Sequence, residues 1–78
     1  MKNAYESFLA HRQSAIRAAG KLIAERLEAG QSLATIADEN GNISGLGVDV
    51  EFAIVFSKIS QSRQTAARKA WNALKADA

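Results

Sequence analysis

Cysteine and proline are both absent from this chain of 78 residues. Without cysteine the chain has no disulfide, no thiolate nucleophile and no cysteine-ligated zinc site. Histidine occurs once, as His11, and it has no evident carboxylate or nucleophile partner in the sequence. We therefore expect a surface or boundary histidine and no enzymatic activity. Gly41, Gly45 and Gly47 have no following lysine, so they do not form a phosphate-binding loop. The sequence predicts neither a cofactor nor a metal site.

Large apolar side chains are also few: the chain has three Phe, one Trp, one Tyr and a modest set of Leu, Ile and Val. The longest apolar run, Phe52 to Phe56, is five residues, far short of a membrane span. No secretion-signal pattern opens the sequence. We expect a cytoplasmic protein without membrane contact, forming a single small domain over residues 1–78. So thin a core usually needs further stabilisation, and without disulfides or metal the remaining source is self-association. We therefore expect a homodimer or a higher oligomer.

Residues 3–28 predict one long amphipathic helix. Asn3 is a suitable N-cap, and Gly30 suits the left-handed residue that ends helices. Gly20, in the middle, costs about 1 kcal/mol relative to alanine. Either another backbone approaches closely there or the glycine is simply tolerated at the surface. The helix is predicted by apolar residues at helical spacing, namely Tyr5, Phe8, Leu9, Ala15, Ile16, Ala19, Leu22, Ile23 and Leu27.

Residues 31–47 form a joint with two interpretations. Ser32 can cap a short helix over residues 33–39, which we favour. The alternative is a β-hairpin, because residues 38–42 have the types that tight turns require.

Residues 48–75 are ambiguous in the same way. Apolar residues at helical spacing favour a single helix from Val48 to Lys75. Their alternation up to Phe56 instead predicts a strand, followed by a shorter helix that Ser60 caps. The favoured fold is all-α: two long antiparallel helices form a hairpin with a short helix or turn between them, and the hairpin dimerises. The alternative is an α+β fold with a small hairpin or strand region at 33–56.

Charge is segregated along the chain, although the formal net charge is only +2. From Gln31 to Ser57 the charged residues are four acids, whereas Lys58 to Ala78 contains five basic residues and one acid. A basic helix of this kind favours contact with nucleic acid, although a solvated helix end can have the same composition. The candidate contacts are side chains able to bond base edges or phosphates: Gln61, Arg63, Gln64, Arg68 and Lys69.

Two segments resemble parts of the helix-turn-helix DNA-binding motif. Residues 52–71 have the resemblance, with a turn before Gln61, but Lys58 stands where the turn prefers glycine and Gln64 stands near the expected apolar anchor. Residues 32–44 have the Ala and Gly spacing of the motif, but they are acidic and contain an inserted residue. The resemblance implies that the segment after the turn contacts DNA.

The first functional hypothesis is therefore a nucleic-acid-associated regulator or accessory protein. The alternative is an adaptor or inhibitor that binds another protein, of the compact kind that mobile genetic elements encode. It would dock through the spare helical stripe or through the acidic and apolar joint, at Asp38, Glu39, Leu46 and Asp49. A large apolar patch left exposed would favour this alternative. The residues expected at interfaces, between copies or with a partner, are Ala19, Gly20, Ile23, Phe52, Phe56 and Trp71.

Overall fold

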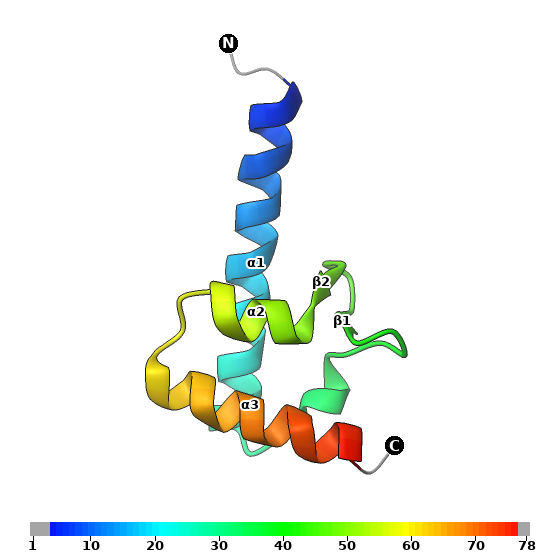
Figure 1. The fold of residues 1–78 in the computed structure, drawn as a ribbon, viewed down its shortest axis with the longest axis vertical. Coiled ribbons are helices and arrows are strands. Elements are labelled where there is room, and N and C mark those ends of the chain that lie inside the picture. Colours follow the sequence, from blue (N-terminus) through cyan, green and yellow to red (C-terminus); the bar gives the residue numbers. More distant parts are fainter. Residues whose placement is uncertain (1–3, 77–78) are drawn as a thin grey trace.

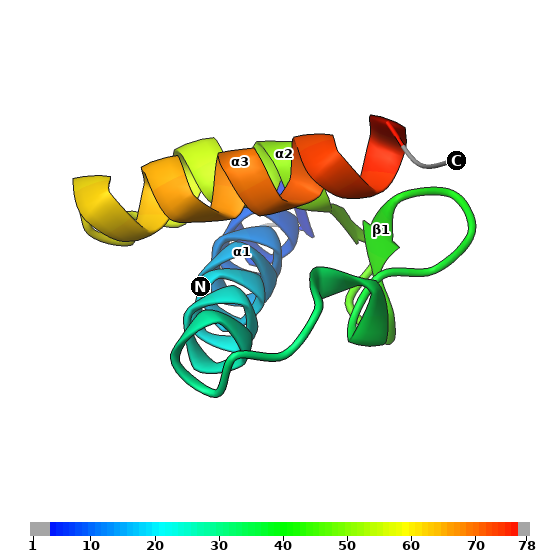
Figure 2. The same cartoon turned by 90° about the horizontal axis from the view of Figure 1, so that it is seen from below.

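The computed structural model describes residues 4–76. The protein is mostly helical, with one two-stranded antiparallel sheet. Figure 1 shows the longest helix crossed near its C-terminal half by two shorter helices, and Figure 2 shows both of these on the same side of it. The elements in chain order are α1 (Ala4–Glu28), the 3-10 turn η1 (Leu33–Thr35), β1 (Asn42–Ile43), β2 (Val48–Asp49), α2 (Val50–Phe56) and α3 (Gln61–Ala76).

The prediction of the first helix is confirmed by α1. The helix ends as its sequence indicates, because Gly30 adopts a φ of 68° and the amide of Gln31 donates to the carbonyl of Arg26 at 2.9 Å. The predicted cap, Asn3, lies outside the described residues. The first turns of α1 extend beyond every other element (Figure 1).

In the joint, the expected helix over residues 33–39 is wrong beyond its first turn. Ser32 does cap η1, since its Oγ accepts from the amide of Ala34 at 3.1 Å. The carboxylate of Asp38 then accepts from the amides of Asn40 and Asn42, at 2.9 and 3.0 Å, and holds a turn that stops the helix. The two strands follow, and β1 pairs with β2. The alternative with a small hairpin within 33–56 therefore describes this region better.

The single helix from Val48 to Lys75 is also wrong, because the chain turns between α2 and α3. Lys58 adopts a φ of 62°, a left-handed value that interrupts a right-handed helix. On one side of the turn, the side-chain amide of Gln64 donates to the carbonyl of Ile54 at 3.1 Å and completes the end of α2. On the other side, Ser60 Oγ accepts from the amide of Arg63 at 3.3 Å and caps α3. The expected pair of equally long helices is thus replaced by one long helix and two shorter ones.

The core lies where the C-terminal half of α1 meets the other elements. Because the chain turns after α2, both α2 and α3 pack over this half of α1, and a core forms within one chain. None of the helices in residues 4–76 is long and apolar enough to cross a membrane. The buried apolar residues come from every element: Ala19, Ile23, Leu33, Ile36, Ile43, Val48, Val50, Ala53, Ile54 and Ala67.

Candidate docking surface on α2

The C-terminal end of α2 presents apolar side chains to solvent. Val50, Ala53 and Ile54 are buried, at the spacing of one helix face, so Val55 and Phe56 turn away from the core. They are 46% and 58% exposed, and they are the large hydrophobic residues found exposed in the described part of the chain. The ring of Phe52, half-buried, lies 4.5 Å from that of Phe56, centroid to centroid. We call Phe52, Val55 and Phe56 the α2 patch.

Four basic side chains surround the α2 patch. The guanidinium of Arg12 lies over the ring of Phe52, 5.5 Å from its centroid. Arg17 and Lys58 line a hollow of about 170 Å³ next to Phe56. Arg68 lines a groove on the side of Val55. None of these four cations, which we call the cationic rim, forms an ion pair with another residue of 4–76.

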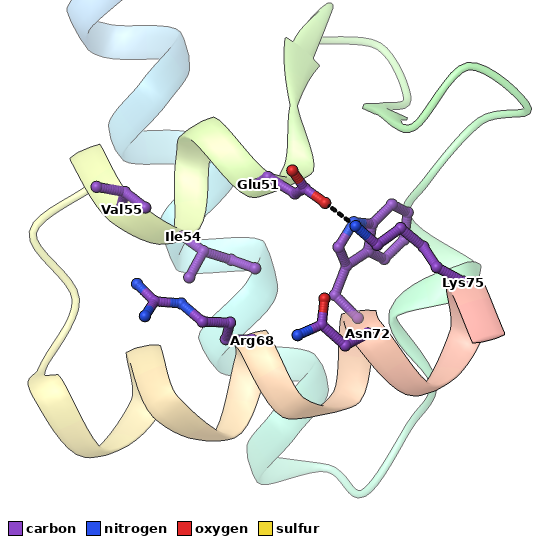
Figure 3. Close-up of a pocket in the computed structure, with 7 residues that line it drawn as sticks. Glu51, Ile54, Val55, Arg68, Asn72 and Lys75 are labelled. Atoms are coloured by element: carbon purple, nitrogen blue, oxygen red, sulfur yellow. Dashed lines mark hydrogen bonds and ion pairs between the residues drawn. The ribbon is translucent and has the colours of Figure 1, made fainter.

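The groove next to Val55 separates α2 from α3 and has a volume of about 340 Å³. At one end Lys75 pairs with Glu51, and at the other Arg68 extends beside Ile54 (Figure 3). The hydrogen bond from Lys75, followed by its positive charge, lowers the pKa of Glu51. Glu51, the only acid that lines the groove, therefore stays ionised and its charge is compensated by Lys75. The charge of Arg68 has no such partner in the groove. The groove is lined by Glu51, Ile54, Val55, Arg68, Trp71, Asn72 and Lys75.

No protein-family model, no curated protein and no solved structure matches this chain. Its function has to be argued from the arrangement of apolar and charged side chains. Among the surfaces of residues 4–76, the end of α2 combines exposed apolar area with unpaired charge.

The residues expected to bind nucleic acid do not share one face of α3. Arg63 pairs with Glu28, from the end of α1, and the side chain of Gln64 is engaged with the carbonyl of Ile54. Arg63 and Arg68 are five positions apart, which places them about 140° apart around the helix. Gln61, Arg68 and Lys69 remain exposed, and α3 contains no acid. The partner of Arg63 was not predictable from local sequence, because it lies 35 positions away.

Of the residues expected at interfaces, Ala19, Gly20 and Ile23 belong to the core of a single chain and have no surface to offer a second one. Of the two interpretations of Gly20, the structure shows the close approach: a Cβ added there would lie 2.4 Å from Ser57 Cβ. The approaching segment is the turn between α2 and α3, not another molecule. Trp71 is half-buried between two hollows. Phe52 and Phe56 lie in the α2 patch.

Sequence reasoning singled out Arg68, although for contact with nucleic acid, and missed the other three members of the cationic rim. In the sequence, Arg12 and Arg17 are indistinguishable from the other polar residues of an amphipathic helix. Only the path of α2 brings them next to Phe52 and Phe56. Lys58 was counted in the basic C-terminal segment and noted for its place in the turn, but nothing in the sequence placed it beside Phe56. Val55 looked like part of a helical core stripe.

The acidic joint has mainly structural contacts. Asp38 holds its turn, and Asp49 caps α2 by accepting from the amide of Phe52 at 3.0 Å. Leu46 is half-buried near α1, and Glu39 is exposed. His11 is exposed and borders a hollow with Leu46. Within residues 4–76 no cluster of three or more acidic or histidine side chains could hold a metal ion.

Proposed function

We propose that this chain is a non-catalytic binding protein that docks another protein on the α2 patch, as a small adaptor or inhibitor. The observation that carries the proposal is the exposure of Val55 and Phe56 beside Phe52. Burying apolar surface is worth about 25 cal/mol per Å², and large apolar side chains therefore tend to lie inside. A group of them at the surface, with a charged border, is typical of an interface.

The composition of this surface supports a protein partner. Interface centres are enriched in aromatic residues and arginine, and a few such residues supply most of the binding energy. Phe52 holds Phe56 in place by ring contact, so little side-chain freedom is lost when Phe56 is covered. The cations around the patch would contribute mainly association rate and selectivity.

The proposal is tested by capture on the immobilised protein. Wild type is compared with Phe56→Ser, and Lys69→Ala, on the outer face of α3, is the matched control. We expect one partner to be retained by wild type and by the control and lost from Phe56→Ser. Circular dichroism checks that all three proteins are folded, as expected for a side chain 58% exposed. A partner retained equally by Phe56→Ser would contradict the proposal.

A second candidate function, contact with nucleic acid, is supported by the exposed polar surface of α3. Gln61, Arg68 and Lys69 are exposed on this helix, which contains no acid, and Arg68 also lines the groove toward α2. The test is fluorescence anisotropy of a labelled random-sequence duplex at low and at physiological salt. Binding through this surface should weaken steeply with salt and be abolished by Arg68→Glu with Lys69→Glu. Unchanged affinity in that double variant would exclude this surface.

We further propose that the chain forms a homodimer through the first turns of α1. These turns extend beyond the rest of the molecule, and their sequence contains Tyr5, Phe8 and Leu9 at helical spacing (Figure 1). An amphipathic helix is stable in water when its apolar side is covered. A second copy would supply that cover.

A further inference from the structure

We infer that the α2 patch binds an acidic amphipathic segment of its partner, one that presents large apolar side chains next to Asp and Glu. The inference rests on the proposed function and adds the chemistry of the occupant. It follows from three features of the surface: its charge, its two hollows, and the poor fit of other occupants.

The charge around the patch is of one sign. Arg12, Arg17, Lys58 and Arg68 border it without an ion-pair partner among residues 4–76. No acid lines the hollow at Phe56, and the acid of the neighbouring groove is paired with Lys75. A partner with carboxylates at its border would complement four charges, whereas a basic one would be repelled.

The patch borders two hollows, one lined by Phe56 and the other by Val55. The hollow at Phe56, about 170 Å³, has Ile16 as its other apolar wall and cations at its border. Pockets that enclose small-molecule ligands measure roughly 300–1,000 Å³, so this hollow is the size for one inserted side chain. The groove at Val55, about 340 Å³ and open, has apolar walls from Ile54 and Trp71 with Arg68 alongside. Each hollow thus pairs an apolar interior with a nearby cation, which matches an apolar anchor flanked by an acid.

Two other occupants fit less well. A second copy related by a two-fold axis would place the cationic rim against itself. Nucleic acid would satisfy the cations, but Val55 would gain no apolar partner from a sugar-phosphate backbone. Phe56 is also a poor stacking platform for a base, because its ring already packs against Phe52.

The test is a selection from a displayed library of random peptides of about sixteen residues, roughly 24 Å long as a helix. Four immobilised proteins are used: wild type, Phe56→Ser, the rim variant Arg17→Glu with Lys58→Glu, and the control Lys21→Glu with Lys69→Glu. The control has the same change in net charge at exposed positions that do not line the two hollows of the patch. We expect wild type and the control to enrich acidic peptides with large apolar residues at helical spacing. The rim variant should lose that preference, and Phe56→Ser should enrich nothing.

One enriched peptide is then measured by anisotropy. Its affinity should weaken about tenfold or more in the rim variant and change little in the control. Enrichment of neutral or basic peptides that still requires Phe56 would overturn the inference and leave the proposed function standing. Enrichment that does not depend on Phe56 would count against both. Binding of a random-sequence duplex that is lost in Phe56→Ser would identify nucleic acid as the occupant and overturn the inference.

Discussion

At the scale of single residues, the tightest constraint is the contact between Gly20 and Ser57. Alanine in place of a mid-helix glycine normally stabilises a helix by about 1 kcal/mol. Here the added Cβ would lie 2.4 Å from both Cβ and Oγ of Ser57, closer than such atoms approach one another. Overpacking of this kind costs about 1–3 kcal/mol, so Gly20→Ala should lower the free energy of unfolding. Urea denaturation measures the change.

The matched control removes the atoms that would clash. In a Ser57→Gly background, Gly20→Ala should cost much less than in wild type, because the facing side chain is gone. A Gly20→Ala protein more stable than wild type would show that the turn moves aside freely. The sequence offered two interpretations of Gly20. The residues close to it in the chain could not decide between them, because Ser57, which it contacts, lies far away in the sequence.

The pair formed by Glu51 and Lys75 predicts a dependence of stability on pH. The hydrogen bond and charge of Lys75 lower the pKa of Glu51 below its ordinary value of 4.5. The stabilisation is therefore fully present above pH 4.5 and is lost as the pH falls through the lowered pKa. Both side chains are about half exposed, so the effect should be small and should weaken with salt.

Melting temperatures of wild type and Glu51→Gln across the acidic range measure this effect. The difference between the two proteins should shrink as the pH falls. Glu39→Gln, at an exposed carboxylate with no ion pair in residues 4–76, is the control and should show no such convergence. A constant difference between wild type and Glu51→Gln at all pH values would contradict the assignment.

At the scale of elements, α1 was predictable because its apolar spacing, its Gly30 and its length all agree. The break between α2 and α3 was harder to predict, since Val48, Phe52, Val55 and Ile59 keep helical spacing up to it. Ser60 was readable as a cap. The bond from Gln64 back to the carbonyl of Ile54 was not, because it forms only once the chain has turned.

The turn itself can be improved by one substitution. Lys58 has a φ of 62°, a region that costs an L-residue about 1–2 kcal/mol and that glycine enters freely. Glycine also adds freedom to the unfolded chain, at about 0.5–1 kcal/mol. Lys58→Gly should therefore raise the free energy of unfolding by about 0.5–1 kcal/mol, measured by thermal denaturation. The same change removes a cation of the rim and should weaken binding of an acidic partner.

Lys21→Gly is the control for that experiment. It introduces the same residue within α1, where glycine should cost about 1 kcal/mol. If both glycine variants are destabilised to the same extent, the turn carries no strain at Lys58.

At the scale of the whole molecule, composition predicted a small helical protein with a thin core. It did not predict on which faces of the molecule apolar side chains remain exposed. The core draws on six elements, so which apolar residues remain outside depends on the path of the chain. Phe56 and Ile54 look equivalent in the sequence, yet one is 58% exposed and the other 2%. Charge segregation along the chain was visible at once. The rim around the α2 patch was not, because half of it comes from α1.

The homodimer predicts that stability depends on protein concentration. Association through α1 stabilises the folded state by mass action, so the thermal midpoint should rise with concentration and sedimentation should show twice the monomer mass. Phe56→Ser should leave both unchanged, because like charges keep two α2 patches apart. A monomeric mass with an invariant midpoint would contradict self-association. Loss of the dimer in Phe56→Ser would instead make the α2 patch the contact between copies, and the proposed partner would then have no apolar surface on which to dock.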